Sequence, residues 1–503
     1  MASRSQLNSM IFKMQVTTAL LLLLITFSLA LAQHEEIPYA EVENICITCS
    51  CQNFTNTKIL NCHDRSLKHI LARWPEQFGT NHTGIEIHAT FSKNDIEILQ
   101  QLPATDGILY FSARRCKIQK LQSKIFIDSP NIFRLDLSFN QLTEEALTPD
   151  VFKGPYNEHE YESIKLKELD LSYNYIRDLD SKLFEHINQL SVLNLAHNRF
   201  SKFDDGAAEA IGCLKYLEVL DISFNHIKIL PDNIFQNLNL HNLNLKNNNF
   251  TSIPNSLNMA HNSLESLDIS YNPIEKIHTD DFNNFNNLKY LNMSDMMTLK
   301  KIEVGTFSVL TKLEELHCKN NFYLTSIHLP TESKFLKILD ISNGNLNSIV
   351  LEVDLLHNAS KNGTLNFWPY IKTIILAENP WNCDCTLAEI LKQFKNITIE
   401  KDDLSRCSSP IELTGTKLSD LNAVEICNGQ HKNRFIIEDP SSSYTPYVLR
   451  AKHVVYILIT IGLVILSGII VGFGLSYGRR RLKSDVIRLK SSPIRYISVR
   501  NSS

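Results

Sequence analysis

The sequence predicts an α/β solenoid, a horseshoe whose short parallel strands form one continuous sheet, followed by a single transmembrane helix. Three observations indicate this fold: apolar residues that return at a fixed spacing, groups of cysteines at both ends of the repeated region, and an uncharged apolar stretch near the carboxyl end. A period of 23 to 27 residues is typical of a solenoid built from leucine-rich coils. One coil cannot bury its apolar edge alone, so the coils are expected to fold as a stack.

The repeat reads L-x-x-L-x-L-x-x-N-x-L, and its clearest copy is Leu217-x-x-Leu220-x-Ile222-x-x-Asn225-x-Ile227. Two apolar residues flank one variable position, so they point inward from a short strand while the variable residue points to the opposite, solvated face. The Asn, here called the ladder residue, can satisfy open backbone groups because an amide both donates and accepts. The eleven ladder positions are Cys116, Asn140, Asn174, Asn198, Asn225, Asn248, Asn272, Met296, Asn321, Gly344 and Asn379.

The predicted repeats cover residues 67–379, with a weaker coil before Cys116 and two long gaps between ladder positions. The acidic stretch 143–163 and the stretch 348–370 are expected to bulge from the coils as loops, because insertions in such repeats map to loops. Met296 and Gly344 replace the usual Asn, so local irregularity is expected there.

The two ends of the chain indicate where it is located. Residues 1–32 combine a basic start, an apolar run and the A-x-A sequence Ala30-Leu31-Ala32, which predicts a cleaved signal peptide. Residues 454–477 carry no charge and as a helix would be about 36 Å long, enough to cross a hydrocarbon core of about 30 Å. A buried core helix is the alternative. Arg479, Arg480 and Arg481 follow at once, so the tail, 478–503, is expected in the cytoplasm and the repeats outside, as in a type I plasma-membrane protein.

Charge and motifs limit the classes of function. The chain has a net charge of −4 although its tail and leader are basic, so the predicted ectodomain is acidic. An acidic ectodomain argues against nucleic acid as a partner. Neither a G-x-S-x-G, nor an H-E-x-x-H, nor a phosphate-loop pattern occurs in the sequence, so we expect no catalytic residue, no metal, no cofactor and no enzyme activity.

Eleven cysteines fall into groups of four, three and four. The outer groups flank the repeats, in the predicted amino-terminal cap, 33–66, and carboxyl-terminal cap, 380–428, and disulfides are expected to staple both caps over the exposed end coils. A zinc site that includes Cys46 and Cys49 is the alternative. The central Cys116, Cys213 and Cys318 are too far apart to pair; Cys213 is expected to be a half-buried thiol or to form an intermolecular disulfide. The eight cap cysteines are Cys46, Cys49, Cys51, Cys62, Cys383, Cys385, Cys407 and Cys427.

The run Asn379-Pro-Trp-Asn-Cys383-Asp-Cys385, with two cysteines downstream, resembles the carboxyl-terminal cap of animal extracellular leucine-rich-repeat proteins, a family that includes Toll-like, Slit-like and adhesion proteins. The cysteines from Cys46 to Cys62 resemble the amino-terminal cap of the same family. Spacing alone leaves three possible pairings of the last four cysteines. The resemblance implies pairs between Cys383 and Cys407 and between Cys385 and Cys427, and it implies a protein ligand.

Two columns of residues are candidates for ligand binding on the concave face. The variable strand position is mainly acidic, and an aromatic residue follows three positions later in several coils, so together they could bind a basic protein surface. The alternative is that these rings simply pack along the sheet. The acidic column contains Asp136, Asp170, Asn194, Asp221, Asn244, Asp268, Asn292, His317 and Asp340. The aromatic column contains Phe139, Tyr173, His197, Phe224 and Tyr271.

Sequons for N-glycosylation predict surface positions in a secreted segment. Asn292 lies on the concave face, so a sugar there would obstruct the later coils and leave the earlier coils, 139–271, for a ligand. The seven ectodomain sequons are at Asn53, Asn81, Asn249, Asn292, Asn358, Asn362 and Asn396.

The membrane segment and the tail carry weaker motifs. Two G-x-x-x-G pairs in the predicted helix could support homo- or hetero-dimers, although glycine is common in such helices. The tail sequence from Tyr496 to Val499 resembles a Y-x-x-apolar sorting signal; a merely solvated tail is the alternative. With about 25 residues, the tail is too short for a signalling domain.

Two functions from different classes remain. One is adhesion or recognition of an extracellular or cell-surface protein through the solenoid. The other is a co-receptor or decoy that binds a soluble ligand or a neighbouring receptor, including receptors of Toll-type or growth-factor pathways, and changes its signalling. The predicted stalk, 429–453, could be cut to release the ectodomain, which favours the decoy.

Overall fold

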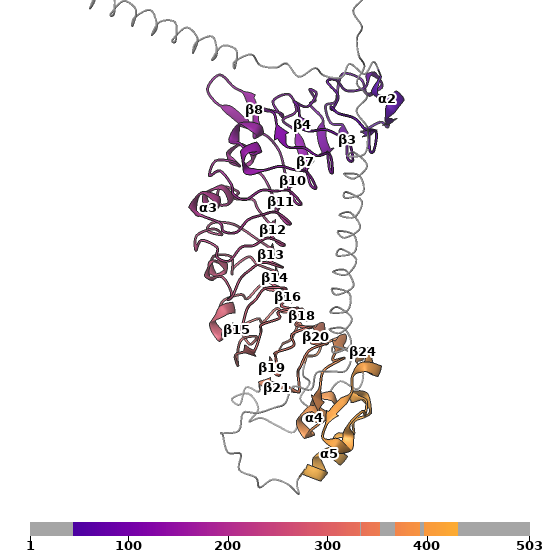
Figure 1. Ribbon diagram of the computed structural model, residues 1–503, viewed down its shortest axis with the longest axis vertical. Helices are drawn as coiled ribbons and strands as arrows, with labels where there is room; N and C mark the ends of the chain where they lie inside the picture. The colour runs from indigo at the N-terminus through magenta and orange to yellow at the C-terminus, as the bar shows by residue number, and fades with distance from the viewer. Residues whose placement is uncertain (1–43, 332, 353–367, 393–396, 431–503) are drawn as a thin grey trace, which may run out of the picture. The chain divides into compact units, whose positions relative to one another are not determined.

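The computed structural model describes residues 44–331, 333–352, 368–392 and 397–430, without the side chains of Thr398 and Gln430. A sheet of 15 strands follows the order of the sequence, and its strands are parallel except for the first pair, which is antiparallel (Figure 1). The strands are β1 Ser50–Asn53, β2 Thr57–Asn61, β3 Glu86–Thr90, β5 Ile108–Ser112, β7 Ile132–Asp136, β10 Glu168–Asp170, β11 Val192–Asn194, β12 Val219–Asp221, β13 Asn242–Asn244, β14 Ser266–Asp268, β16 Tyr290–Asn292, β18 Glu315–His317, β20 Ile338–Asp340, β22 Thr373–Ile375 and β24 Thr398–Glu400.

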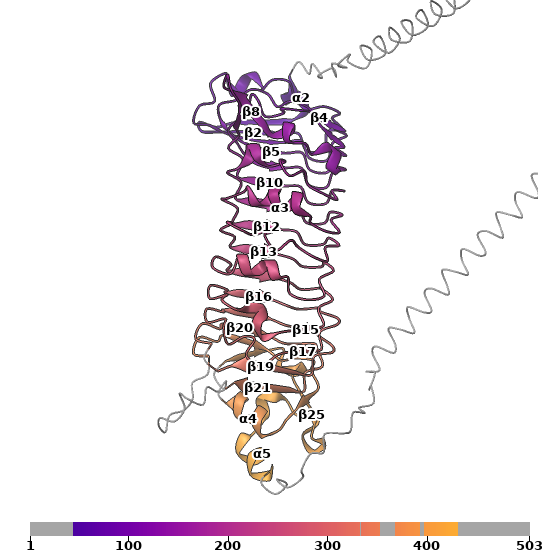
Figure 2. The ribbon, with the colours of Figure 1, turned by 90° about the vertical axis from the view of Figure 1, so that its left-hand side faces the viewer.

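Each coil returns from its strand through turns, short helices or paired two- to five-residue strands (Figure 2). The longest helix in a coil, α3 (Asp205–Gly212), begins where the Asp204 side chain accepts a hydrogen bond from the Ala207 amide. The other α-helices are α2 Ile45–Thr48, α4 Cys385–Lys392 and α5 Ala423–Gln430. The remaining strands are β4 Ile98–Leu99, β6 Lys120–Leu121, β8 Lys153–Tyr156, β9 Tyr161–Ser163, β15 Lys276–Ile277, β17 Lys301–Ile302, β19 Ser326–Pro330, β21 Ser348–Glu352, β23 Trp381–Asn382 and β25 Cys407–Ser409.

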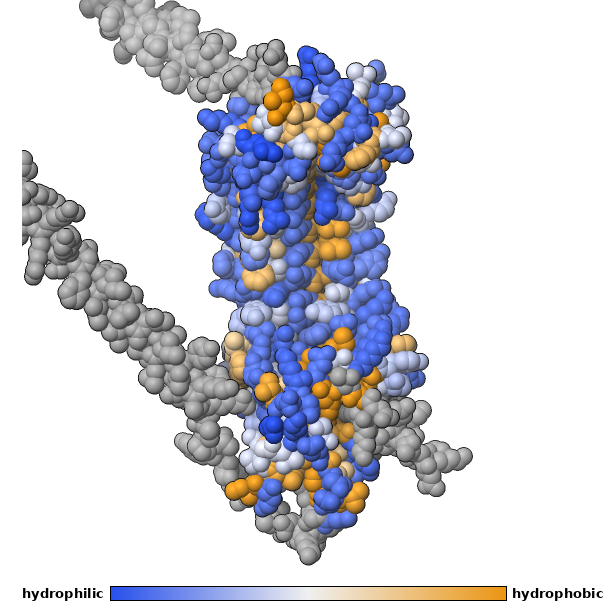
Figure 3. All heavy atoms as spheres, turned by 90° about the vertical axis from the view of Figure 1, so that its right-hand side faces the viewer, coloured by the Kyte–Doolittle hydropathy of each residue, from blue (hydrophilic) through white to orange (hydrophobic). Residues whose placement is uncertain are grey.

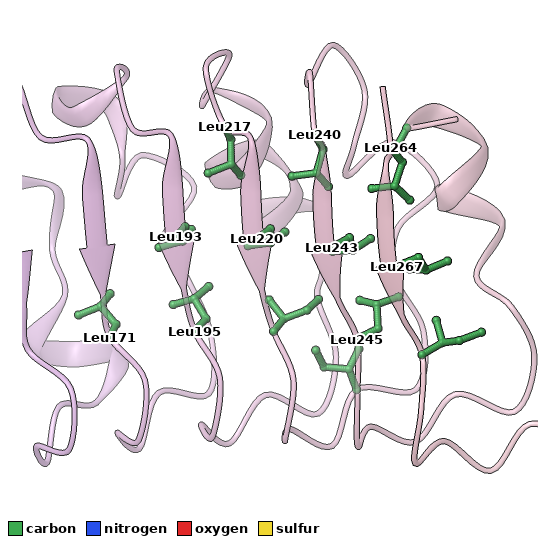
Figure 4. Packing of buried hydrophobic residues seen from close by; sticks show 14 of the residues in the cluster. Leu171, Leu193, Leu195, Leu217, Leu220, Leu240, Leu243, Leu245, Leu264 and Leu267 are labelled. Carbon is green, nitrogen blue, oxygen red and sulfur yellow. The ribbon is translucent and has the colours of Figure 1, made fainter. Parts of the chain in front are cut away.

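The core follows from the apolar positions of the repeat. The central residues of consecutive strands, such as Leu193, Leu220 and Leu243, are at most 2% exposed and lie in one layer between the sheet and the returning turns (Figure 4). Burying one such side chain contributes roughly 1.5–3 kcal/mol, so a long stack of equivalent residues stabilises the whole sheet. The repeat spacing therefore predicted the large parallel sheet correctly.

The ladder residues tie each coil to the preceding one. The Asn225 side chain, 3% exposed, donates to the carbonyl oxygens of Leu195 and Ile222, each at 3.1 Å, and accepts from the Phe200 amide at 3.2 Å. Asn94 makes the same type of contact in the weak coil before Cys116, where its amide donates to Phe91 and Cys62. Backbone groups that a turn leaves open are thus satisfied inside the core.

The irregularity expected at Met296 and Gly344 does not reach the strand register. The strands around Met296 and Gly344 pair without a register shift, because the backbone amides of these residues still donate to Asn321 and Asn379 in the next coil. Met296 and Gly344 lack only the hydrogen bonds that an Asn side chain would make to the preceding coil. A register shift occurs instead where β5 meets β7, between Leu109 and Tyr110.

The two long gaps differ from simple loops. The acidic stretch 143–163 contains the hairpin of β8 and β9, and it buries Val151 and Phe152 in the core. In the second gap, Ser348–Glu352 forms β21 beside β19 and Trp368 is buried, while residues 353–367 lie outside the described part of the chain. Apolar residues in both segments extend the core, and the periodic pattern does not reveal them.

Disulfides close both ends of the solenoid. Cys46 bonds Cys51 and Cys49 bonds Cys62 at the amino-terminal end, so the two cysteines weighed as zinc ligands are held in separate disulfides. At the other end, Cys383 bonds Cys407, as the resemblance implied.

The remaining bridge joins the helices α4 and α5 through Cys385 and Cys427. Cys116, Cys213 and Cys318 are free thiols.

No helix within the described ranges is long and apolar enough to cross a membrane. The predicted signal peptide, membrane span and tail, with Tyr496 and Val499, lie outside those ranges, as does the predicted stalk apart from its first two residues, which end α5.

Candidate functional site

One residue in each coil, immediately before the ladder position, has a left-handed backbone. Its amide donates to a carbonyl oxygen of the next coil, as from Phe139 to Ser172 at 2.9 Å and from Tyr173 to Ala196 at 2.9 Å. These residues form a line, the left-handed column, along the carboxyl edge of the sheet. Its members are Lys93, Arg115, Phe139, Tyr173, His197, Phe224, Asn247, Tyr271, Asp295, Asn320, Asn343 and Glu378, with φ between 51° and 60°.

The structure places the predicted aromatic residues in this column. Strand β7 ends at Asp136, so Phe139 lies in the turn beyond the strand, at the edge of the concave face and not on its strands. The same holds for Tyr173 after β10 and for Phe224 after β12. The sequence predicted both columns on the concave face; in the structure the acidic column lies on the strands and the aromatic column lies just beyond them, at the edge of that face, because the chain turns before it reaches these residues.

Four of the five aromatic residues stack on one another. Ring centroids are 3.8 Å apart for Phe139 and Tyr173, 3.9 Å for Tyr173 and His197, and 4.0 Å for His197 and Phe224. These distances are shorter than the strand spacing of about 4.8 Å, so the rings lean together. Burial lowers the pKa of the His197 imidazole, and the neutral ring stacks without a charge. The rings do pack along the sheet, and we call these four residues the aromatic stack.

The stack keeps one edge in solvent. Tyr173 is 40% exposed, and Tyr175, two residues later, is also 40% exposed. Tyr271 lies outside the stack because Asn247 occupies the intervening coil; the Lys246 ammonium lies 5.7 Å from the Phe224 centroid and 5.0 Å from that of Tyr271. One side of the solenoid is mainly hydrophilic and carries a broken strip of apolar residues (Figure 3).

The amino-terminal end of the stack carries two arginines that the sequence reading missed. The guanidinium carbons of Arg114 and Arg115 lie 4.4 Å and 4.5 Å from the centroid of the Phe139 ring, and both side chains are exposed. Within the described ranges, no carboxylate lies within 4.0 Å of either guanidinium. The sequence could have indicated this contact, because aligning the coil of Cys116 with that of Asn140 places Arg115 at the position equivalent to Phe139.

The acidic column has a structural task in the turns. In one coil after another, the side-chain oxygen accepts a hydrogen bond from the amide two residues later, as from Ser172 to Asp170 at 2.9 Å and from Ser223 to Asp221 at 2.9 Å. The second carboxylate oxygen can accept a hydrogen bond from a side-chain amide of the neighbouring coil, as Asp221 does from Asn244 at 2.9 Å. These carboxylates hold the chain where it leaves each strand, so their acidity alone is weak evidence for a basic ligand.

Asp136 and Asp170 are adjacent in this column with no amide between them. Burial, followed by smaller effects that include the charge of Asp136, raises the pKa of the Asp170 carboxyl. In the later coils the left-handed column changes to amides, where Asn320 donates to Asp295 and Asn343 to Asn320, both at 2.7 Å. The aromatic part of the edge is thus confined to the earlier coils.

The sequons differ in their surroundings. Asn53, Asn81 and Asn249 are exposed. Asn292 is half-buried in the acidic column, where its amide donates to Asp268 at 2.9 Å. Asn358, Asn362 and Asn396 lie outside the described residues.

The fold and both caps define a class, the disulfide-capped leucine-rich-repeat solenoids. Leucine-rich-repeat models match residues 164–219, 216–238 and 238–297. The chain is 30% identical over 155 residues to lumican from Oryctolagus cuniculus, and the match covers 31% of this chain and 71% of lumican. This chain therefore belongs to the leucine-rich-repeat family of animal extracellular proteins.

Two further relatives match with a lower identity or over a smaller part of the relative. Tsukushi from Gallus gallus is 27% identical over 273 residues, 49% of this chain and 67% of Tsukushi. The match to human lumican covers only 40% of that protein. A chain from the octameric complex of Latrophilin 3, Unc5D and FLRT2 matches at 19% identity with a TM-score of 0.40, covering 74% of this chain and 97% of that one.

Proposed function

We propose that this protein is a cell-surface glycoprotein that recognises another protein through the aromatic stack and its flanking cations. The observation that carries this proposal is the edge itself. Four rings lie in contact over four coils, are held in left-handed backbone, and still leave one edge in solvent. Rigid aromatic side chains give large contact area for little loss of side-chain entropy on binding, which makes such a surface suitable for protein recognition.

The proposal includes the predicted chain organisation. A signal peptide, 1–32, directs the chain to the secretory pathway, and the span 454–477 anchors it as a type I plasma-membrane protein with the repeats outside. The family supports an extracellular location for the repeats. Glycans at the exposed sequons keep the surrounding surface free of other proteins, and Tyr496 and Val499 serve as a sorting signal. The protein acts by binding and not by catalysis.

Recognition leads to adhesion when the partner is on another cell. The alternative is a co-receptor or decoy, in which the same edge binds a soluble ligand or a receptor in the same membrane and the partner signals. Cell aggregation on expression would support adhesion, whereas release of the ectodomain at the stalk, 429–453, would support the decoy.

The test uses the full-length chain on cells, exposed to an array of secreted and cell-surface proteins that includes its own ectodomain. The edge variant Tyr173→Asn/His197→Asn is compared with Tyr216→Asn, a control for the loss of an exposed ring, since Tyr216 is 64% exposed and lies outside the stack. We expect the edge variant to lose at least about tenfold in affinity for any specific partner, a difference of about 1.4 kcal/mol, and the control to keep it. Equal binding by the wild-type chain and the edge variant would contradict the proposed role of the stack.

A further inference from the structure

We propose that the amino-terminal end of the aromatic stack takes an acidic segment of the partner protein, with its carboxylates on Arg114 and Arg115 and its apolar side chains along the rings. This inference rests on the proposed recognition function and adds the chemistry of the partner. The partner segment is therefore acidic, whereas the acidic strand column by itself predicts a basic partner.

The two arginines differ from two other cations of the same coils, Lys117 and Arg134. Lys117 pairs with Asp95 at 2.6 Å, and Arg134 pairs with Glu168 at 3.1 Å. Arg114 and Arg115 have no such partner in the described part of the chain, although both lie on one ring. A carboxylate is the group whose geometry matches a guanidinium, because it can accept two parallel hydrogen bonds.

The ring holds the guanidinium groups in position before a partner binds. Contact with an aromatic face contributes about 0.5–1 kcal/mol at an exposed site, and the opposite face of Phe139 is covered by Tyr173. Two cations at neighbouring positions also repel each other, and an anion between them relieves that repulsion. Preorganised, unpaired cations lower the cost of ordering side chains on binding.

The nearby acids of the fold cannot take this role. The side chain of Asp136 accepts from the Ser138 amide at 3.0 Å and from the Ser112 hydroxyl at 3.3 Å, and Asp170 accepts from the Ser172 amide. Arg114 acts on Asp170 only through its charge, beyond ion-pair distance. These carboxylates also disfavour an acidic segment that crosses the strands, so the segment is expected to run along the edge.

The chemistry of the left-handed column gives the segment a direction. The column begins with the exposed cations Lys93 and Arg115, continues through the four rings, and reaches Asp295 in a later coil. An acidic end therefore belongs beside Arg115 and an apolar end toward Phe224. An extended segment rises about 3.3 Å per residue, so about four residues cover the four rings.

The experiment measures peptide binding to the purified full-length chain in detergent micelles by fluorescence anisotropy. The probe is a labelled peptide with three glutamates followed by alternating tyrosine and glycine; its twins carry glutamine or lysine in place of glutamate. In about 0.05 M salt we expect the acidic peptide to bind at least about tenfold more tightly than the glutamine twin, and the difference to shrink at about 0.3 M salt.

The variant Arg114→Glu/Arg115→Glu is expected to bind the acidic peptide at least about tenfold more weakly and the lysine twin more tightly. The control Lys301→Glu/Lys319→Glu makes the same change of net charge at exposed lysines of later coils, and Lys319 occupies the turn position that Arg114 occupies in its own coil. We expect the control to bind like the wild type. Thiol labelling restricted to Cys213 checks that each variant is folded, since Cys116 and Cys318 are buried.

The outcomes separate the two proposals. Acidic recognition is overturned if the wild-type chain binds none of the peptides, if the glutamine twin binds as well as the acidic peptide, or if the arginine variant and the lysine control lose affinity equally. Loss of binding in Tyr173→Asn/His197→Asn together with unchanged binding in the arginine variant would leave the edge as a recognition surface but exclude an acidic partner. The reverse result would keep the anionic site and overturn the role of the stack.

Discussion

Each carboxylate in the acidic column accepts hydrogen bonds from its own turn. The residues beside it in the column determine whether its charge stabilises or destabilises the folded state. Asp221 receives a hydrogen bond from Asn244, and Asp268 receives one from Asn292, each at 2.9 Å. Asp170 has the carboxylate of Asp136 in the preceding coil, and burial is the main cause of its raised pKa. A like charge beside a partly buried carboxylate destabilises the folded state, so this pair is a weak point in an otherwise alternating column.

We predict that Asp170→Asn stabilises the protein by about 0.5–1.5 kcal/mol at neutral pH. The amide can still accept from the Ser172 amide and can donate to Asp136, as Asn244 does to Asp221, and one such hydrogen bond contributes about that amount. Chemical denaturation of the full-length chain measures the change. Asp221→Asn is the matched control, since amides of Asn194 and Asn244 already flank this position and a third amide should not stabilise.

The effect should depend on pH with a defined sign. The pKa of Asp170 is raised in the folded state, so between the unfolded value of about 3.9 and the higher folded value the native protein binds more protons. The contribution of this group to stability is therefore fully present at low pH and is lost as pH rises through the folded pKa. The gain in Asp170→Asn should shrink below about pH 4; a gain that is independent of pH would show that the carboxylate charge is not its cause.

At the scale of one coil, two neighbouring positions have opposite tasks. The ladder residue points into the core and joins two coils, whereas the left-handed residue before it points outward and meets its equivalents in adjacent coils. A left-handed backbone is most easily adopted by Gly, Asn and Asp, and it costs other residues about 1–2 kcal/mol. Phe, Tyr and His hold these positions in the earlier coils, where stacking offsets that cost.

We predict that Asn225→Ala destabilises the protein by about 2–4 kcal/mol. It removes donors to Leu195 and Ile222 and the acceptor of the Phe200 amide, which leaves buried backbone groups unsatisfied. The unfolding midpoint in denaturant measures the loss. Asn249→Ala, at an exposed position two residues after the left-handed Asn247, should change stability by less than about 0.5 kcal/mol.

We predict that His197→Asn changes stability by less than about 1 kcal/mol, because relief of backbone strain offsets the loss of two stacking contacts. Partner binding should nevertheless fall, since the stack is interrupted at its centre. His197→Val is the informative comparison: a β-branched residue keeps the strain and loses the stack, so it should destabilise more than Asn. Equal stability of both variants would show that the backbone strain is unimportant here.

At the scale of the whole solenoid, stability depends on a continuous core closed at both ends. Buried leucines repeat from coil to coil, and the disulfides of Cys49 and Cys383 fix the end coils, which have a neighbour on one side only. Burial raises the pKa of the free thiols of Cys116 and Cys213 to about 11 and of Cys318 to about 12, so all three are protonated and slow to react near neutral pH.

We predict that a maleimide labels Cys213 in the native chain, slowly, and labels Cys116 and Cys318 only after unfolding. Cys213 is half-buried and the other two are buried. Mass spectrometry of labelled peptides measures the reaction, with labelling in denaturant as the reference. A fully protected Cys213 would point to an intermolecular disulfide, which reduction before labelling would reveal.

We predict that Cys385→Ser/Cys427→Ser costs about 2–4 kcal/mol and loosens the carboxyl-terminal cap, because this disulfide closes a loop of 42 residues. Limited proteolysis should then cut first between α4 and α5. Cys116→Ser, which removes a thiol without breaking a cross-link, is the control. Unchanged resistance of the cap in the double variant would show that packing alone holds it.

The sequence by itself determined the large parallel sheet, the ladder contacts and the cysteines of both caps, because each depends on a spacing that recurs within one coil. It also gave the identity of the aromatic and acidic columns. Only the tertiary structure decided how coils share groups: that four rings stack, that Arg114 and Arg115 rest unpaired on Phe139, that most acids hold turns, and that Met296 and Gly344 leave the register intact. The ring and cation contacts join residues 24 to 34 positions apart, and the geometry of all these contacts depends on the curvature and turns of the stacked chain.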